Sequence, residues 1–67
     1  MKLMSADGYA RFGQILRTLR ARGDRPGFLE MGLAADLVMA QEMGDDDEAE
    51  RCRIKLDLSP EEVRGAS

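Results

Sequence analysis

The residues best suited to chemistry form an acidic run, in which five carboxylates occupy the six positions from Asp45 to Glu50. Such a run could bind a cation, imitate the phosphates of a nucleic acid, or begin a helix. A calcium loop needs oxygen ligands at alternating positions and a glycine at its sharp turn. Consecutive side chains on a helix point about 100° apart, so Asp45, Asp46 and Asp47 are not expected to converge on one ion. We therefore expect no metal site and no cofactor.

The start of a helix accounts for the whole run. Asp45 can accept hydrogen bonds from the free backbone N–H groups of a first turn, and Glu48 stands where a capping box has its second side chain. Acids at the beginning and the cations Arg51, Arg53 and Lys55 near the end both complement the helix dipole. The competing interpretation is an acidic inhibitor of the phage type, a decoy that occupies the groove of a nucleic-acid-binding protein.

Catalysis finds little support among the remaining residues. Cys52 is the single cysteine, and the chain has no histidine. The thiol therefore lacks a general base, a disulfide partner and the other ligands of a Cys/His zinc site. We expect Cys52 to belong to the core, and we predict a protein that is not an enzyme and has no catalytic residues.

Charge is divided unevenly along the chain. Residues 1–25 carry six cations and two acids, a net charge of +4, whereas residues 26–67 carry four cations and eleven acids, a net charge of −7. Arginines of the first helix could contact phosphates, which supply most non-specific affinity for nucleic acids. They lie on both flanks of that helix, so nucleic-acid binding is an alternative and not the favoured function. The charged residues expected to border an interaction surface are Arg11, Arg17, Arg20, Arg22, Asp45, Asp46, Asp47 and Glu48.

Residues 1–67 are expected to form one small all-α domain. Apolar residues three and four apart, beginning with Tyr9, predict the first helix, and Gly23 ends it. A tight turn follows, so the first two helices should form an antiparallel hairpin, with a third helix and a short C-terminal helix after it. The expected helices span about residues 7–22, 27–43, 45–56 and 59–64.

Residues 52–58 allow a second interpretation, because their apolar and polar residues alternate as in a strand. We favour a helix as far as Leu56, because the charge order and the cap agree with it and no convincing second strand is available. After this segment, Ser59, Pro60 and Glu62 form a helix start signal.

The second helix determines the function that we expect. Its apolar residues fall on every side of the helix, and such a helix must be covered on every side. A chain of 67 residues hides only roughly 60% of the surface of its unfolded form, so the other helices are too few to cover it. We expect a helical oligomer, with a homodimer favoured, or docking onto another protein. The expected interface residues are Phe28, Met31, Leu33, Ala35, Val38, Met39 and Met43.

The sequence also bears on location. The longest apolar stretch is interrupted by Asp36 and is much shorter than the ~20 residues that cross a bilayer. No signal peptide is recognised at the beginning of the chain, and a single thiol fits a reducing compartment. We therefore expect a cytoplasmic protein without a membrane segment that acts as a small interaction or regulatory module.

Overall fold

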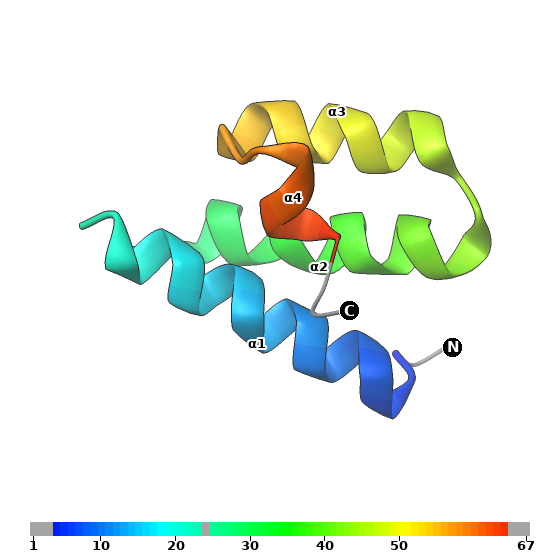
Figure 1. Ribbon diagram of the computed structural model, residues 1–67, viewed down its shortest axis with the longest axis horizontal. Helices are drawn as coiled ribbons and strands as arrows, with labels where there is room; N and C mark the ends of the chain where they lie inside the picture. The colour runs from blue at the N-terminus through cyan, green and yellow to red at the C-terminus, as the bar shows by residue number, and fades with distance from the viewer. Residues whose placement is uncertain (1–3, 24, 65–67) are drawn as a thin grey trace.

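The computed structural model describes residues 4–23 and 25–64 and folds them into four helices (Figure 1). The expected all-α fold is confirmed, and the described residues contain no strand. Each expected helix is present, with both ends within one residue of the expected positions. Residues 52–56 belong to the third helix, so the strand alternative is excluded. The helices are α1 (Ala6–Ala21), α2 (Phe28–Met43), α3 (Asp46–Leu56) and α4 (Pro60–Val63).

Helix α2 is the central element of the fold. Helix α1 runs antiparallel to it as the expected hairpin, and α3 returns along α2 in the opposite direction (Figure 1). Helix α4 lies between α1 and α3 on one side of α2, where Gln41 Nε2 donates a hydrogen bond of 2.8 Å to the Val63 carbonyl. Helices α1 and α3 therefore cover α2 from opposite flanks and α4 closes the side between them, so that together they cover one half of α2.

The core is built on that half of α2. Ala34, Leu37 and Val38 are fully buried there, and Phe12 and Leu16 of α1 pack against the core from its edge. The other buried apolar residues come from α1, α3 and the C-terminal segment: Ile15, Leu19, Cys52, Leu56, Leu58 and Val63.

The first turn of α1 corrects one expectation about its apolar stripe. Tyr9 begins the apolar spacing that predicts this helix, but it is 56% exposed. Gly8 faces α2 instead, because a methyl group at Gly8 would overlap the Glu42 carboxylate and lie 3.3 Å from Cγ1 of Val38. A neighbouring residue in a helix points about 100° away, so Tyr9 is turned out of this contact.

Hydrogen bonds join the beginning of α1 to the end of α2. The Ser5 hydroxyl accepts from the Gly8 backbone N–H at 3.0 Å, as an N-cap residue does. The same hydroxyl donates to the Glu42 carboxylate at 2.7 Å, and Arg11 Nη2 lies 3.8 Å from that carboxylate. The two helix ends therefore share one polar cluster.

Residues in the left-handed conformation follow the ends of the first three helices. Gly23 and Gly44 have φ angles of 88° and 75°, as expected for glycines that stop α1 and α2. Asp57 stops α3 with a φ of 56°, and Arg53 Nη1 supports this turn by donating to the Leu58 carbonyl at 2.7 Å. The start signal of α4 is confirmed as a reciprocal capping box between Ser59 and Glu62.

Among the described residues, none of the helices combines the length and the apolar character needed to span a bilayer.

Truncation of the core at Leu37 tests this arrangement. We expect Leu37→Ala to lower the free energy of unfolding by about 2–5 kcal/mol, because it leaves a cavity among residues with no exposure. Urea unfolding followed by circular dichroism measures the change. Ile54→Ala is the control, since Ile54 is 61% exposed, and its effect should stay within about 1 kcal/mol. Equal losses in the two variants would contradict the described core.

Candidate interaction surface

One half of α2 is left uncovered by the other helices. Phe28 at its beginning is 96% exposed and Met43 at its end is 65% exposed. Gly32 between them is exposed, and Ala35 and Met39 are half-buried. These five residues recur every three or four positions and thus lie along one side of the helix. We call Phe28, Gly32, Ala35, Met39 and Met43 the open face of α2.

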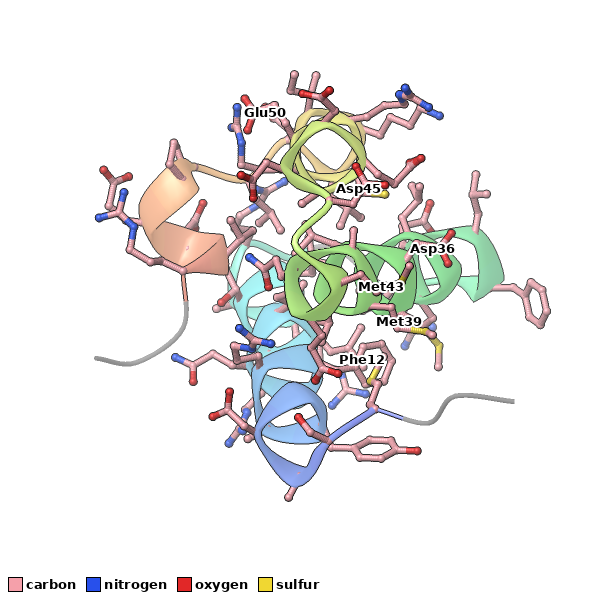
Figure 2. The ribbon with its side chains drawn as sticks, turned by 90° about the vertical axis from the view of Figure 1, so that its right-hand side faces the viewer. Phe12, Asp36, Met39, Met43, Asp45 and Glu50 are labelled. Carbon is pink, nitrogen blue, oxygen red and sulfur yellow. The ribbon has the colours of Figure 1, made fainter. Side chains whose placement is uncertain are left out.

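The open face lies opposite the C-terminal helix. Figure 2 shows Met39 and Phe12 on the side of α2 that points away from α4. Asp36 is exposed at the border of the open face, and a hollow of about 370 Å³ beside it is lined in part by Met39, Met43 and Asp45. Two further apolar residues of α2 extend the exposed area, Leu29 at 69% and Met31 at 44% exposure.

The expected interface residues are therefore divided between the surface and the core. Phe28, Met31 and Met43 are exposed, and Ala35 and Met39 are half-buried on the open face. Leu33 is half-buried and packs against the core cluster. Val38 is the correction: its exposure is 0%, because the helix rotation that exposes Phe28 turns Val38 toward α1. The structure thus uses Val38 within the chain, and it is not available to a partner.

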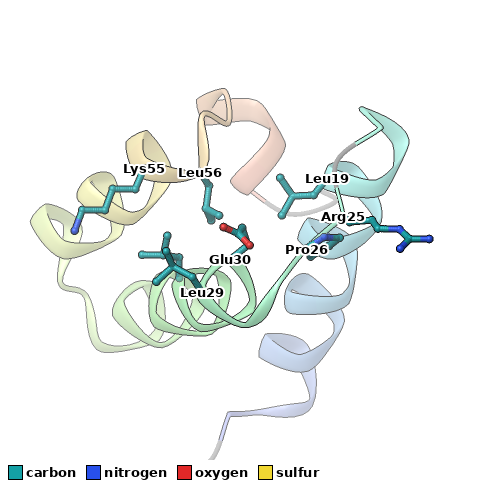
Figure 3. Close-up of a pocket in the computed structure, with 8 residues that line it drawn as sticks. Leu19, Arg25, Pro26, Leu29, Glu30, Lys55 and Leu56 are labelled. Carbon is teal, nitrogen blue, oxygen red and sulfur yellow. The ribbon is translucent and has the colours of Figure 1, made fainter.

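A groove that the sequence did not predict adjoins the open face (Figure 3). It has a volume of about 530 Å³ and lies where the end of α1, the beginning of α2 and the end of α3 meet. Its apolar lining comes from Leu19, Pro26, Leu29, Leu33 and Leu56, with Arg25, Glu30 and Lys55 as charged members. The Glu30 carboxylate accepts a hydrogen bond of 2.8 Å from the Gly27 N–H, so it also serves to cap α2. The signal that could have suggested the groove is Leu29, which belongs to the apolar circumference of α2.

The arginines expected at the rim differ in what they contact. Arg11 lies between Asp7 and Glu42, and its side chain is only 22% exposed. Arg22 Nη1 donates to the carbonyl of Asp57, in the turn after α3. Arg17 Nε donates to the carbonyl one turn earlier in α1, and Arg20 is exposed. Arg11 and Arg22 thus serve the fold, while Arg17 and Arg20 face outward.

The acidic run is arranged as a helix beginning, with one difference from the expected capping box. The Asp45 carboxylate accepts from the Glu48 N–H at 3.2 Å. The reciprocal bond is absent from this described segment, because the Asp45 N–H donates to the Ala40 carbonyl at 2.8 Å. The Glu48 carboxylate instead pairs with Arg51 at 3.4 Å. Only the first half of the expected box is therefore present.

The rest of the run also has helical roles. Glu50 pairs with Arg53, and the hydrogen bond from that guanidinium lowers the pKa of the Glu50 carboxyl. Asp46 and Asp47 are exposed in the first turn of α3, where acids complement the helix dipole. Within the described part of the chain, no three acidic, cysteine or histidine side chains gather as metal ligands would.

Cys52 is buried in the core, as expected, with an exposure of 2%. Its Sγ lies 3.7 Å from the Glu48 carboxylate, to which it donates. Burial raises the pKa of the thiol, and the neighbouring Glu48 charge raises it further. A thiolate is the reactive form of cysteine, so this environment favours the unreactive form.

The chain matches no protein-family model, no curated protein and no solved structure among those compared. Its function is therefore argued from its own surface.

The buried thiol gives a pH prediction. Because the pKa of Cys52 is higher in the folded than in the unfolded protein, its contribution to stability is complete below the ordinary thiol pKa of about 8.5 and is lost as pH rises through the raised folded value. We expect the free energy of unfolding to fall above about pH 8.5, and to fall less in Cys52→Ala. Urea unfolding between neutral and alkaline pH measures both slopes, and parallel slopes would refute the prediction.

Proposed function

We propose that this protein is a non-enzymatic protein–protein interaction module that acts through the open face of α2, with a homodimer as its favoured assembly. The observation that carries the proposal is the pair of large apolar side chains at the two ends of that face, Phe28 and Met43, which are 96% and 65% exposed. Gly32, Ala35 and Met39 connect them without a charge, so the surface between them is continuous and apolar.

Energetics support a partner for this surface. Scattered apolar residues are normal on a protein surface, but a contiguous patch is typical of an interaction site. Burying a Phe or Met side chain contributes about 1.5–3 kcal/mol relative to leaving it exposed. A lone core in a domain of this size seldom provides more than about 3–5 kcal/mol. Covering Phe28 and Met43 would therefore add stability comparable to that of the core itself.

The charged residues support the two alternative functions less well. Binding of a nucleic acid would use the arginines of α1, but Arg11 and Arg22 already contact acceptors within the chain. An acidic inhibitor would use the run in α3, but Glu48 and Glu50 are paired with arginines of the same helix. Both alternatives stay predictions from the sequence. A regulatory role and a cytoplasmic location are likewise proposals, the latter because of the single thiol.

Replacing Phe28 tests the proposed surface. We expect the purified chain to be a dimer by light scattering and Phe28→Glu to make it a monomer, because a buried charge without a partner opposes association. The variant should keep its helicity, since an acid in the first turn of a helix complements the dipole. Ile54→Glu is the matched control on α3, where the residue is 61% exposed, and it should stay dimeric.

Two results together would contradict the proposed homodimer. A wild-type chain that is monomeric at all accessible concentrations, together with a Phe28→Glu variant of unchanged stability and mass, would refute the homodimer.

A further inference from the structure

We infer that the partner of the open face is a second copy of this chain, with the two α2 helices packed antiparallel about a two-fold axis beside Ala35. In this arrangement Met39 of each copy lies over Gly32 of the other. Phe28 of each copy meets Met43 of the other. The inference rests on the proposed function and adds the identity of the partner, its direction and its register.

The first argument is that Gly32 faces open space among the described residues. Gly32 lies within α2, where glycine weakens a helix relative to alanine. Apart from the backbone of its own helix, a methyl group at Gly32 would meet no atom of the described residues within 4 Å, and the φ of Gly32 is not positive. Gly8 is different, because a methyl group there would overlap Glu42. A missing side chain allows another backbone or side chain to approach closely, and at Gly32 none of the described residues occupies that place.

The second argument is the order of large and small residues along the open face. From Phe28 to Met43 the sizes are large, small, small, large and large. If a copy of α2 is reversed about a point between Ala35 and Asp36, Gly32 stands opposite Met39 and Phe28 stands opposite Met43. The flexible Met39 side chain then has an open place above Gly32. Phe28 of one copy and Met43 of the other then form a sulfur–aromatic contact, which is favourable.

A parallel pair lacks this complementarity. In a parallel arrangement each residue meets its own equivalent, so Gly32 would face Gly32 while Met39 would face Met39. Large residues would then collide at one level and small residues would leave a gap at another, and poor packing of this kind is costly. The sequence of sizes therefore favours the antiparallel direction.

Size and charge also agree with a second copy. The 16 residues of α2 span about 24 Å at a rise of ~1.5 Å each. A stable interface buries about 800 Å² per partner, roughly a sixth of the 4711 Å² surface of the chain. The exposed side chains of Leu29 and Met31 on α2 extend the open face toward that size. The charged residues of α2 at its border are Asp36 on one side and Glu42 on the other, and both are acids. Arg11 is already paired with Glu42, so this border does not favour a nucleic acid.

Asp36 sets a limit on this assembly. The two-fold axis places Asp36 of both copies on the same flank, where their like charges repel each other. Because Asp36 is exposed, salt screens this repulsion. The dimer should therefore tighten slightly as salt is added, which is opposite to the behaviour of a complex with nucleic acid.

The glycine provides a sharp test. We expect Gly32→Leu to raise the dimer dissociation constant about tenfold or more, because the new side chain fills the place of Met39. The same change should raise the melting temperature of the monomer, since leucine is a far better helix former than glycine. Sedimentation equilibrium and thermal unfolding at low concentration measure the two opposite effects.

Gly13→Leu is the matched control for helix propensity. Gly13 lies within α1, where a methyl group would meet only the Arg17 side chain, at 3.7 Å. Its dissociation constant should stay at the wild-type value. If Gly32→Leu and Gly13→Leu have equal dissociation constants, the inference is overturned.

Cross-linking tests the direction and separates this inference from the proposed function. In a Cys52→Ala background, chains with Phe28→Cys are mixed with chains with Met43→Cys and oxidised with oxidised glutathione. An antiparallel pair in this register gives the mixed disulfide as the main product, because disulfides need Cβ atoms about 3.5–4.5 Å apart. Disulfides between two Phe28→Cys chains would overturn the antiparallel direction.

The remaining outcomes distinguish the two claims. A dimer that Phe28→Glu dissociates but that gives no mixed disulfide supports the proposed function and overturns the register. A chain that is monomeric by itself overturns the register and the homodimer together.

Discussion

The structure depends on one imbalance: α2 is apolar on all sides, and the other helices of the described residues cover only half of it. Ala34, Leu37 and Val38 satisfy the covered half, where α1, α3 and α4 converge. The uncovered half of α2 is also apolar, since it carries Phe28 and Met43. The described residues contain no further helix to place there. The hairpin, the position of α4 and the exposed surface all follow from which half is covered.

Charged residues serve a different purpose in this fold. The acids and arginines are concentrated at helix ends, where they satisfy free backbone groups or pair along one helix. Asp45 caps α3, Ser59 and Glu62 cap α4, and Arg53 joins Glu50 to the turn after α3. The strong division of charge along the sequence therefore becomes, in the structure, a series of local contacts, and this is why the charged residues give weaker indications of a ligand than the apolar ones do.

The sequence predicted the helix ends well because their signals are local. Gly23 and the Ser59 start signal each act within a few residues, so they can be recognised without knowledge of the fold. The predictions of which residues are buried were less accurate, because burial depends on how each helix is rotated against its neighbours. The apolar spacing of α1 begins with Tyr9, yet Tyr9 is exposed. Val38 was expected at an interface because α2 has no polar side to orient it. The second half of the Asp45 box failed for a related reason, since the end of α2 already occupied the Asp45 N–H. The groove beside Leu29 needs three helices in place before it exists.

The Ser5 hydroxyl, which caps α1 while donating to Glu42, links two segments that are 37 positions apart in the chain. Fraying of the first turn of α1 would withdraw a donor from Glu42, and fraying at the end of α2 would withdraw the acceptor from Ser5. These two helix termini therefore open and close together, as one cooperative unit in local unfolding. The amides of both ends should accordingly be protected as a group, although they belong to different helices.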